Sequence, residues 1–205
     1  MLKLEIMKHL TMEQSEIKWE CRFNGALATD RAGRLFDARF RQTLHSTRRP
    51  LSEKEVRAVE AMTALRITAR LMRQLMDRWA DTHGLSEGRL HVLFQLLAAP
   101  DRQLPLGELA DQLDVTPRNV TGLIDHLERD GLVERVDDPD DRRSTYARLT
   151  PAGAKRLDSM RGEGLYWQMK IASGLSTEEL EQFRHACLKV IENMTGAPVA
   201  AGRTA

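Results

Sequence analysis

The sequence predicts a mainly helical protein in which a small lobe of short helices and a β-hairpin lies between longer helices. Three observations lead to this expectation. Two short amphipathic segments are joined by a tight turn, two strand-like segments with a charged loop follow directly, and capped apolar stripes flank the block. Of the 205 residues, 41% are hydrophobic but 5% aromatic, which favours aliphatic packing between helices.

The first fifty residues differ in character from the rest of the chain. Between Cys21 and Pro50, seven arginines are accompanied by two aspartates, whereas residues 1–20 show no clear period. We interpret residues 1–50 as a partly basic extension that is solvated or loosely packed. The alternative is a basic arm that contacts a phosphate backbone or a second subunit.

Two helices are predicted next, over residues 52–84 and 86–99. Ser52 and Glu55 form a capping box at the start of the first helix, and Ser86 caps the second. The apolar positions of the first helix are Val56, Val59, Met62, Leu65, Leu71, Leu75, Met76 and Trp79. In the second helix we expect four buried side chains: Leu90, Leu93, Phe94 and Leu97.

A helix–turn–helix is predicted over residues 106–127. Asp114 and Val115 make the turn, because aspartate tolerates a left-handed backbone better than most residues. Thr116 is a good N-cap for the second helix, and Pro117 suits its first position, where no N–H is needed. Each helix has an apolar face, formed by Leu106, Leu109, Ala110 and Leu113 in the first and by Val120, Leu123, Ile124 and Leu127 in the second.

A β-hairpin follows the second helix. Gly131 suits the C′ position of that helix, residues 132–136 and 145–149 are short strands, and residues 137–144 form a turn-rich loop. Residues 102–104 are expected to add a first strand to the same sheet. This order of helix, turn, helix, strand, charged loop and strand is typical of a winged helix, and we expect such a domain to bind DNA.

Two further capped helices end the predicted fold. Thr150-Pro151 opens a helix that runs to Lys170, and Ser176 with Glu179 forms a second capping box. The last helix carries an apolar stripe: Leu180, Phe183, Cys187, Val190, Ile191 and Met194. The small lobe cannot cover this face, so we expect a partner surface, with Cys187 in buried packing.

Three segments in and around the hairpin are distinctive: Asp138-Pro139…Asp141-Arg142-Arg143, Leu149-Thr150-Pro151-Ala152-Gly153 and Leu127-Glu128-Arg129-Asp130-Gly131-Leu132-Val133. In these segments the chain resembles the MarR family of bacterial transcriptional regulators, over roughly residues 52–194. The resemblance implies a homodimer bound to double-stranded DNA. It also implies an organisation of the chain: an extension at 1–50, a winged-helix domain at 51–195 with dimerisation helices at 51–84 and 151–195 and a DNA-binding lobe at 86–150, and a flexible tail at 196–205.

We expect DNA contacts in two segments. At the start of the second helix of the helix–turn–helix they are Thr116, Pro117, Arg118, Asn119 and Thr121, because small or hydrogen-bonding side chains there suit a major-groove helix. At the hairpin tip the resemblance implies that Arg143 enters the minor groove and that Asp141 orients it, with Arg142 on phosphate. The alternative for this tip is a solvated charge cluster. Residues 116–150 hold six arginines and eight acidic residues, so binding would depend on a few well-placed arginines.

An effector site is expected where the long helices border the lobe. Urate-responsive members of the family have an extension with a tryptophan, here Trp19, but an aspartate where this chain has His91, which argues against urate. We expect instead an anionic or phenolic ligand near four residues: Arg70, Arg73, Trp79 and His91. The alternative is that these are helix-face and core residues. A redox role for Cys21, as in some relatives, is a further alternative.

Other functional classes lack the residues that they need. His83, His91 and His126 do not have metal-ligand spacing, and we expect neither a metal nor a cofactor. No nucleophile–base pair or phosphate-binding loop stands out, so no enzyme is predicted. No secretory or membrane-spanning segment is predicted, and with two cysteines we expect a cytoplasmic protein. The chain is thus predicted to be a DNA-binding regulator, a repressor that an effector releases from a pseudo-palindromic operator; the alternative is a winged-helix protein-interaction module without DNA reading.

Overall fold

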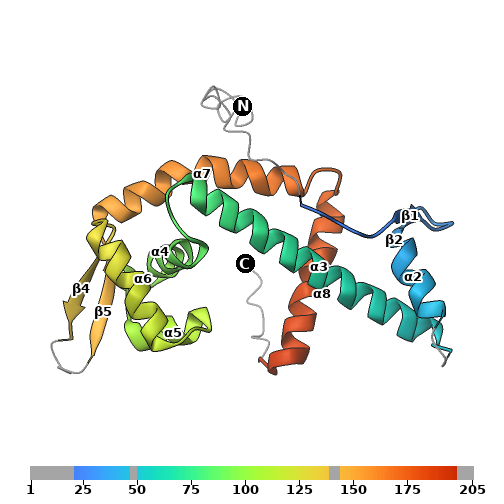
Figure 1. Cartoon of the computed structure of the whole chain (residues 1–205), viewed down its shortest axis with the longest axis horizontal. Coiled ribbons are helices and arrows are strands. Elements are labelled where there is room, and N and C mark those ends of the chain that lie inside the picture. Colours follow the sequence, from blue (N-terminus) through green and yellow to red (C-terminus); the bar gives the residue numbers. More distant parts are fainter. Residues whose placement is uncertain (1–20, 47–49, 139–143, 198–205) are drawn as a thin grey trace, which may run out of the picture. The chain divides into compact units, whose positions relative to one another are not determined.

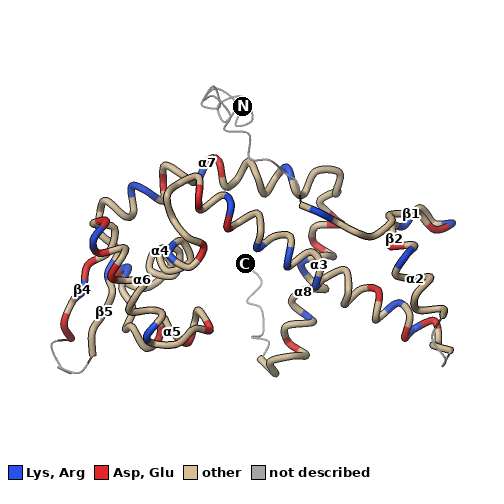
Figure 2. The backbone as a smooth tube through the Cα atoms, viewed as in Figure 1, with Lys and Arg blue, Asp and Glu red and all other residues tan. Residues whose placement is uncertain are grey.

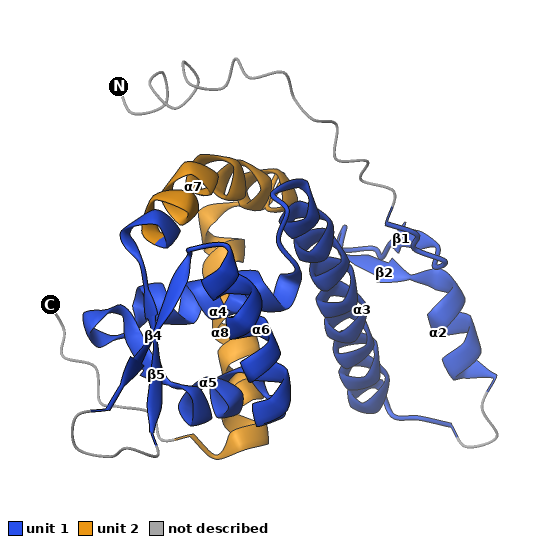
Figure 3. Ribbon diagram, turned by 60° about the vertical axis from the view of Figure 1, so that its left-hand side comes forward, with its two compact units in different colours: residues 1–153 blue, residues 154–205 orange. Residues whose placement is uncertain are grey.

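The computed structural model describes residues 21–46, 50–138 and 144–197. The chain divides into two compact units, Met1–Gly153 and Ala154–Ala205 (Figure 3). The elements, labelled in Figure 1, are β1 (Leu27–Thr29), β2 (Leu35–Asp37), α2 (Ala38–His45), α3 (Glu53–Thr82), α4 (Glu87–Ala98), the 3₁₀ turn η1 (Pro100–Arg102), β3 (Gln103–Pro105), α5 (Leu106–Leu113), α6 (Pro117–Arg129), β4 (Val133–Asp137), β5 (Thr145–Leu149), α7 (Pro151–Ile171) and α8 (Thr177–Thr195).

A winged-helix lobe forms the best-packed part of the first unit. Helices α4, α5 and α6 pack together and against an antiparallel sheet with the strand order β3-β5-β4 (Figure 1). The predicted fold class is confirmed, and β3 and β4 each begin one residue later than the sequence pattern predicts. The core of the lobe is formed by Leu90, Val92, Leu93, Leu96, Leu104, Leu109, Ala110, Val120, Ile124, Leu127, Val133, Ala147 and Leu149.

One prediction about α4 is wrong. Phe94 and Leu97 are 38% and 40% exposed, whereas Val92 and Leu96 are fully buried. Helices α5 and α6 and the sheet all pack against α4. The buried face of α4 therefore includes Leu96 and does not include Phe94. The helical spacing of apolar residues correctly predicts an apolar stripe on α4. It does not show which of these residues face the core of the lobe.

The described part of the extension before α3 contains regular secondary structure, which its composition does not indicate. Strands β1 and β2 form a hairpin in which Ala28 pairs with Phe36. The side chain of Asp30 accepts hydrogen bonds from the backbone of Ala32 and Arg34 at 2.9 Å each, which shapes the turn between the strands. Asp37 caps α2 by accepting a backbone hydrogen bond from Arg39 at 3.1 Å. Short-range aspartate hydrogen bonds therefore build this segment.

Helix α2 is attached to α3 by a paired ionic contact. Arg41 donates to both carboxylate oxygens of Glu60, at 2.5 and 2.9 Å. The guanidinium of Arg41 also lies 3.7 Å from the centre of the Phe36 ring. Because Arg41 hydrogen-bonds to it, the pKa of Glu60 lies below its ordinary value. The described part of the extension is thus a small hairpin–helix module seated on α3.

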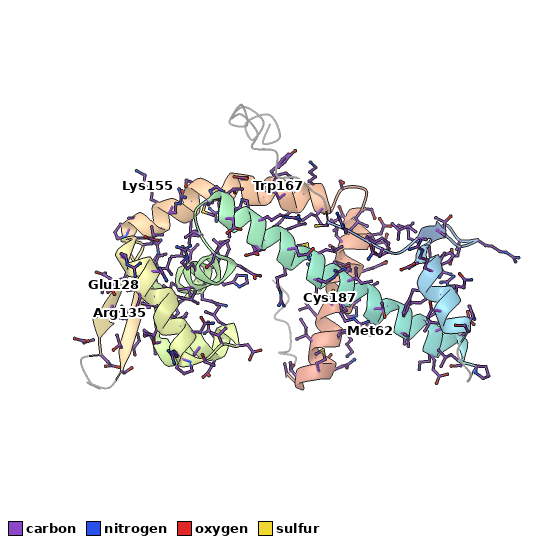
Figure 4. The ribbon with its side chains drawn as sticks, viewed as in Figure 1. Met62, Glu128, Arg135, Lys155, Trp167 and Cys187 are labelled. Carbon is purple, nitrogen blue, oxygen red and sulfur yellow. The ribbon has the colours of Figure 1, made fainter. Side chains whose placement is uncertain are left out.

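The long helix α3 buries little of its apolar stripe within the chain. Its capping box forms as predicted: Glu55 N–H donates to the Ser52 hydroxyl, and Glu55 accepts from the Ser52 backbone. In the helix only Trp79 and Ala80 are buried. Met62, labelled in Figure 4, is exposed, as are Val59 and Met72.

The second unit is formed by most of α7 and by α8. Trp167 donates from Nε1 to Glu163 at 3.3 Å, and Lys170 Nζ lies 5.0 Å from the Trp167 ring. Helix α8 begins with the predicted Ser176–Glu179 capping box but has no buried residue. Cys187 is half-buried in the single chain, and its burial against a partner surface stays a prediction. The described residues of the chain leave the stripe on α8 largely exposed.

Candidate nucleic-acid interface

The turn between α5 and α6 sets the direction of the second helix. Asp114 has the left-handed conformation that the sequence predicts, with φ 51° and ψ 46°. The N–H of Val115 then donates to the carbonyl of Ala110 at 3.1 Å and closes the turn. An α-helical residue at this position would continue α5, so the left-handed aspartate is what starts a new helix at Pro117.

The N-terminus of α6 is open to solvent. The five predicted contact residues are all exposed: Thr116, Pro117, Arg118, Asn119 and Thr121. The Thr116 hydroxyl accepts from the Asn119 N–H at 3.3 Å, and the Thr121 hydroxyl donates to the Pro117 carbonyl at 3.0 Å. The first turn contains no acidic residue. The helix therefore presents an uncompensated partial positive charge with hydrogen-bonding side chains around it.

The opposite face of α6 holds the helix rigidly in the lobe. Val120, Ile124 and Leu127 are fully buried, as the apolar period predicts. Each such side chain stabilises the fold by about 1.5–3 kcal/mol through removal of apolar surface from water. The exposed N-terminal side chains are thus positioned by a helix that cannot easily shift.

A charged cluster joins α6 to the base of the hairpin. Arg135, on β4, forms ion pairs with Asp125 and Glu128 of α6, and Figure 4 labels the Arg135–Glu128 pair. The backbone N–H of Arg135 also donates to Glu128 at 3.1 Å. Burial lowers the pKa of Arg135, but the two carboxylates outweigh burial and raise it overall. This cluster fixes the hairpin relative to the helix, and sequence reasoning missed it.

Further ion pairs involve acidic residues of the segment 116–150. Besides Asp125 and Glu128, Glu134 accepts from Arg148 at 2.8 Å and Asp130 lies 3.4 Å from Arg89. Figure 2 shows residues of both charge signs on α6 and β4. Among the residues of this segment that the structure describes, the acids paired with arginines thus include Asp125, Glu128, Asp130 and Glu134. The α6 N-terminus is left as the acid-free end of the helix.

The hairpin is described up to the last residues before its tip. The β4–β5 register ends with Asp137 opposite Thr145, and the Asp138 N–H donates to the Ser144 carbonyl at 3.2 Å. The predicted tip residues Asp141, Arg142 and Arg143 lie outside the described residues.

The four predicted effector residues lie in different surroundings. Arg70 lines a cleft with Arg22, Gln74, Asp77 and Arg78. Trp79 is buried with its ring edge-on to His83, 5.5 Å between centroids. Arg73 is exposed on α3 and His91 is half-buried on α4. Of these four residues, Arg70 is the one that lines the cleft.

The described residues also bear on metal binding and membrane insertion. Within residues 21–46, 50–138 and 144–197, no group of three His, Cys, Asp or Glu side chains could hold a metal ion. In the same ranges, every helix is too short or too polar to cross a lipid bilayer.

Known proteins share both the sequence and the fold. The MarR family model matches residues 85–145. The HTH-type transcriptional repressor YetL of Bacillus subtilis is 32% identical over 126 residues, which cover 62% of this chain and 75% of YetL. The DNA complex of MepR from S. aureus is 26% identical, with a TM-score of 0.57 over 64% of this chain and 96% of MepR.

A second solved structure agrees in fold. Sco3205 of Streptomyces coelicolor, a MarR family transcriptional regulator in complex with DNA, superposes with a TM-score of 0.60 at 23% identity, over 73% of this chain and 93% of Sco3205. The sequence matches, together with the exposed helix N-terminus and the hairpin beside it, show that this chain belongs to the MarR family of DNA-binding transcriptional regulators.

Proposed function

We propose that the chain represses transcription as a cytoplasmic homodimer on a pseudo-palindromic operator, and that a small anionic or phenolic effector releases it. The observation that carries the DNA-binding part is the exposed, acid-free N-terminus of α6. The description of YetL as a transcriptional repressor supports the direction of regulation.

In this proposal α6 enters the major groove with its N-terminus first. Arg118 and Asn119 are exposed, and each can form paired hydrogen bonds with a base edge, arginine with guanine and asparagine with adenine. Thr116, Pro117 and Thr121 complete the contact surface, where the helix N-terminus also favours a phosphate. The hairpin tip with Asp141, Arg142 and Arg143 would follow the backbone into the minor groove, because Arg135 directs the hairpin from α6.

The apolar faces of the long helices support a dimer. Helix α8 exposes Phe183 and Ile191 by 55% and 51%, and α3 exposes Met62 by 46%. Exposed apolar side chains in such a row are typical of subunit interfaces. We assign residues 51–84 and 151–195 to dimerisation and residues 86–150 to DNA binding, with 1–50 as an extension and 196–205 as a tail. A two-fold dimer would place half-sites about 10 base pairs apart.

The effector part is proposed from charge and position. Arg70, Arg73, Trp79 and His91 remain the residues that we assign to effector binding. Their cations and rings suit an anionic or phenolic compound. Addition of such a compound should weaken operator binding.

Selection of bound fragments from the host genome, followed by mobility shift, tests the proposal. Arg118→Ala should weaken binding by about 1–3 kcal/mol and relax the base preference at one position in each half-site. Arg143→Ala should weaken binding while changing folding stability by less than about 0.5 kcal/mol. Arg129→Ala, at the other end of α6, is the matched control and should bind nearly as the parent does.

Two results would contradict the proposal. One is selection that yields no preferred sequence, which would favour the protein-interaction module. The other is equal binding by the parent, Arg118→Ala and Arg143→Ala proteins at several salt concentrations, because contacts with bases and phosphates cannot be removed without effect.

A further inference from the structure

We propose that the cleft between Arg22 and α3 binds a small oxyanion that carries two negative charges. The cleft has a volume of about 410 Å³ and is lined by Arg22, Arg70, Gln74, Asp77 and Arg78. This volume lies within the ordinary range for small-molecule sites. Binding depends on the cleft alone; only its effect on DNA release rests on the proposed function.

The lining of the cleft comes from two distant chain segments. Residues 70, 74, 77 and 78 recur at helical spacing, so they share one face of α3. Arg22 approaches this face from the segment before β1. Convergence of a second segment makes the feature a cleft rather than a charged helix face.

The cleft is electrostatically incomplete. Three arginines face one aspartate, so the lining carries a net charge of +2. Like charges near one another on a helix are destabilising, and one carboxylate cannot compensate three guanidiniums. An anion with two charges would neutralise the site. The arginine fork matches the planar carboxylate, and the Gln74 amide adds a neutral donor.

A contact beside the cleft holds its two sides together. Arg78 Nη2 donates to Cys21 Sγ at 2.8 Å, which fixes the segment next to Arg22 against α3. The Nε of Arg78 is buried and lacks a hydrogen-bond partner among the described residues. Such a donor is costly to leave unpaired. The described residues thus link the two sides of the cleft and leave one buried N–H of Arg78 without a partner.

Calorimetric titration of the full chain with succinate, without DNA, tests the binding. Succinate should bind, while acetate and the neutral succinamide should bind at least about tenfold more weakly. Inorganic phosphate serves as the second dianion and distinguishes a phosphate site from a dicarboxylate site. Arg70→Gln and Arg22→Gln should each reduce affinity for the preferred dianion about tenfold or more.

Arg66→Gln is the matched control. Arg66 is an exposed arginine on the same helix that does not line the cleft, so its removal lowers the net charge equally and should leave affinity nearly unchanged. Circular dichroism checks that each variant is folded. Equal losses in all three variants would overturn the proposal, because binding would then follow bulk charge. Absence of binding by either dianion would overturn it as well.

Alkylation by iodoacetamide supplies a site-specific readout. A dianion in the cleft should slow modification of Cys21, because Cys21 Sγ contacts Arg78, which lines the cleft, while Cys187 serves as the internal reference. Equal rates at Cys21 with and without saturating dianion would count against the site. Repeating the titration on the operator complex then separates the two proposals. If the dianion binds without weakening DNA binding, the cleft is an anion site but is not the effector site.

Discussion

Helices α6 and α8 are both amphipathic, yet the described residues bury the apolar side chains of α6 and leave those of α8 exposed. In α6 three of the four apolar side chains, Val120, Ile124 and Leu127, are fully buried inside the lobe. In α8 no residue is buried, and Phe183 and Ile191 are more than half exposed. The same type of sequence pattern therefore serves two purposes. In α6 it stabilises the chain's own fold, and in α8 it needs a surface that the described chain does not provide.

The two helices also begin differently. Helix α8 has Glu178 and Glu179 in its first turn, and α3 has Glu53 and Glu55, so their own carboxylates satisfy the helix N-termini. Helix α6 has no acidic residue there. Because carboxylates and phosphates compete for the same partial charge, the missing acid leaves α6 available to an outside anion. The cap thus distinguishes a structural helix from a contacting one.

The largest expected effect is the loss of the dimer in Phe183→Glu. A charge placed in an apolar interface costs about 4 kcal/mol, or roughly a 1,000-fold weaker dimer. Sedimentation equilibrium measures the dissociation constant. Gln182→Glu, which adds the same charge on the other side of α8, is the control and should remain dimeric. An unchanged dimer in Phe183→Glu would mean that the α8 stripe is not the interface.

The next effect concerns the covered face. Ile124→Ala should lower the free energy of unfolding by about 3 kcal/mol, because it leaves a cavity in a closely packed core. In the monomeric Phe183→Glu background, Ile191→Ala should cost less than about 1 kcal/mol, since that side chain is half exposed. Urea unfolding monitored by circular dichroism measures both. Similar losses of unfolding free energy in Ile124→Ala and Ile191→Ala would show that the apolar faces of α6 and α8 do not differ in their contribution to stability.

The sequence predicted most of what depends on near neighbours. The Asp114 turn, the Thr116 cap and both capping boxes form as predicted, because each needs only residues within one or two helical turns. The hairpin β1–β2 was missed although Asp30 and Gly33 supply a turn signal. Strands of three residues are too short for alternation to be visible.

Contacts between distant elements could not be predicted in the same way. Arg135 pairs with Asp125 and Glu128 only once β4 folds back beside α6, and a charge in a strand has many candidate partners. The exposure of Phe94 likewise depends on which elements surround α4. The roles of the DNA-contact residues, from Thr116 on α6 to Arg143 in the hairpin loop, remain predictions.

A smaller effect is expected from giving α6 the cap of α8. Asn119→Glu would complete a capping box with Thr116, and should raise folding stability by about 0.5 kcal/mol. It should also weaken operator binding by about tenfold or more, because a carboxylate then occupies the phosphate-facing end of the helix. Thermal unfolding and mobility shift measure the two effects.

Asn119→Gln is the control for this exchange. It can complete the same capping box without a charge, so it should stabilise the helix and retain more DNA binding than Asn119→Glu. If both variants bind DNA equally, the charge at the α6 N-terminus has no role in binding, and the second difference between α6 and α8 loses its functional meaning.

The smallest expected effect is a difference in acid sensitivity between the helix caps. Hydrogen bonds from the Ser176 backbone and hydroxyl hold the pKa of Glu179 below its ordinary value of 4.5, and those from the Ser52 hydroxyl and backbone do the same for the pKa of Glu55. A carboxylate whose pKa is lowered by folding stabilises the protein above its unfolded pKa, and this stabilisation is lost as the pH falls through the folded pKa.

Between about pH 5 and pH 3, the free energy of unfolding measured in urea should therefore fall more steeply for the parent than for Glu55→Gln/Glu179→Gln. Glu181→Gln, on α8 outside the capping box, should follow the parent. Because Thr116 caps α6 through a hydroxyl that does not titrate, the N-terminus of the contacting helix should stay capped over the same range. Parallel acid limbs for the parent and the double variant would show that the two types of cap do not differ in this respect.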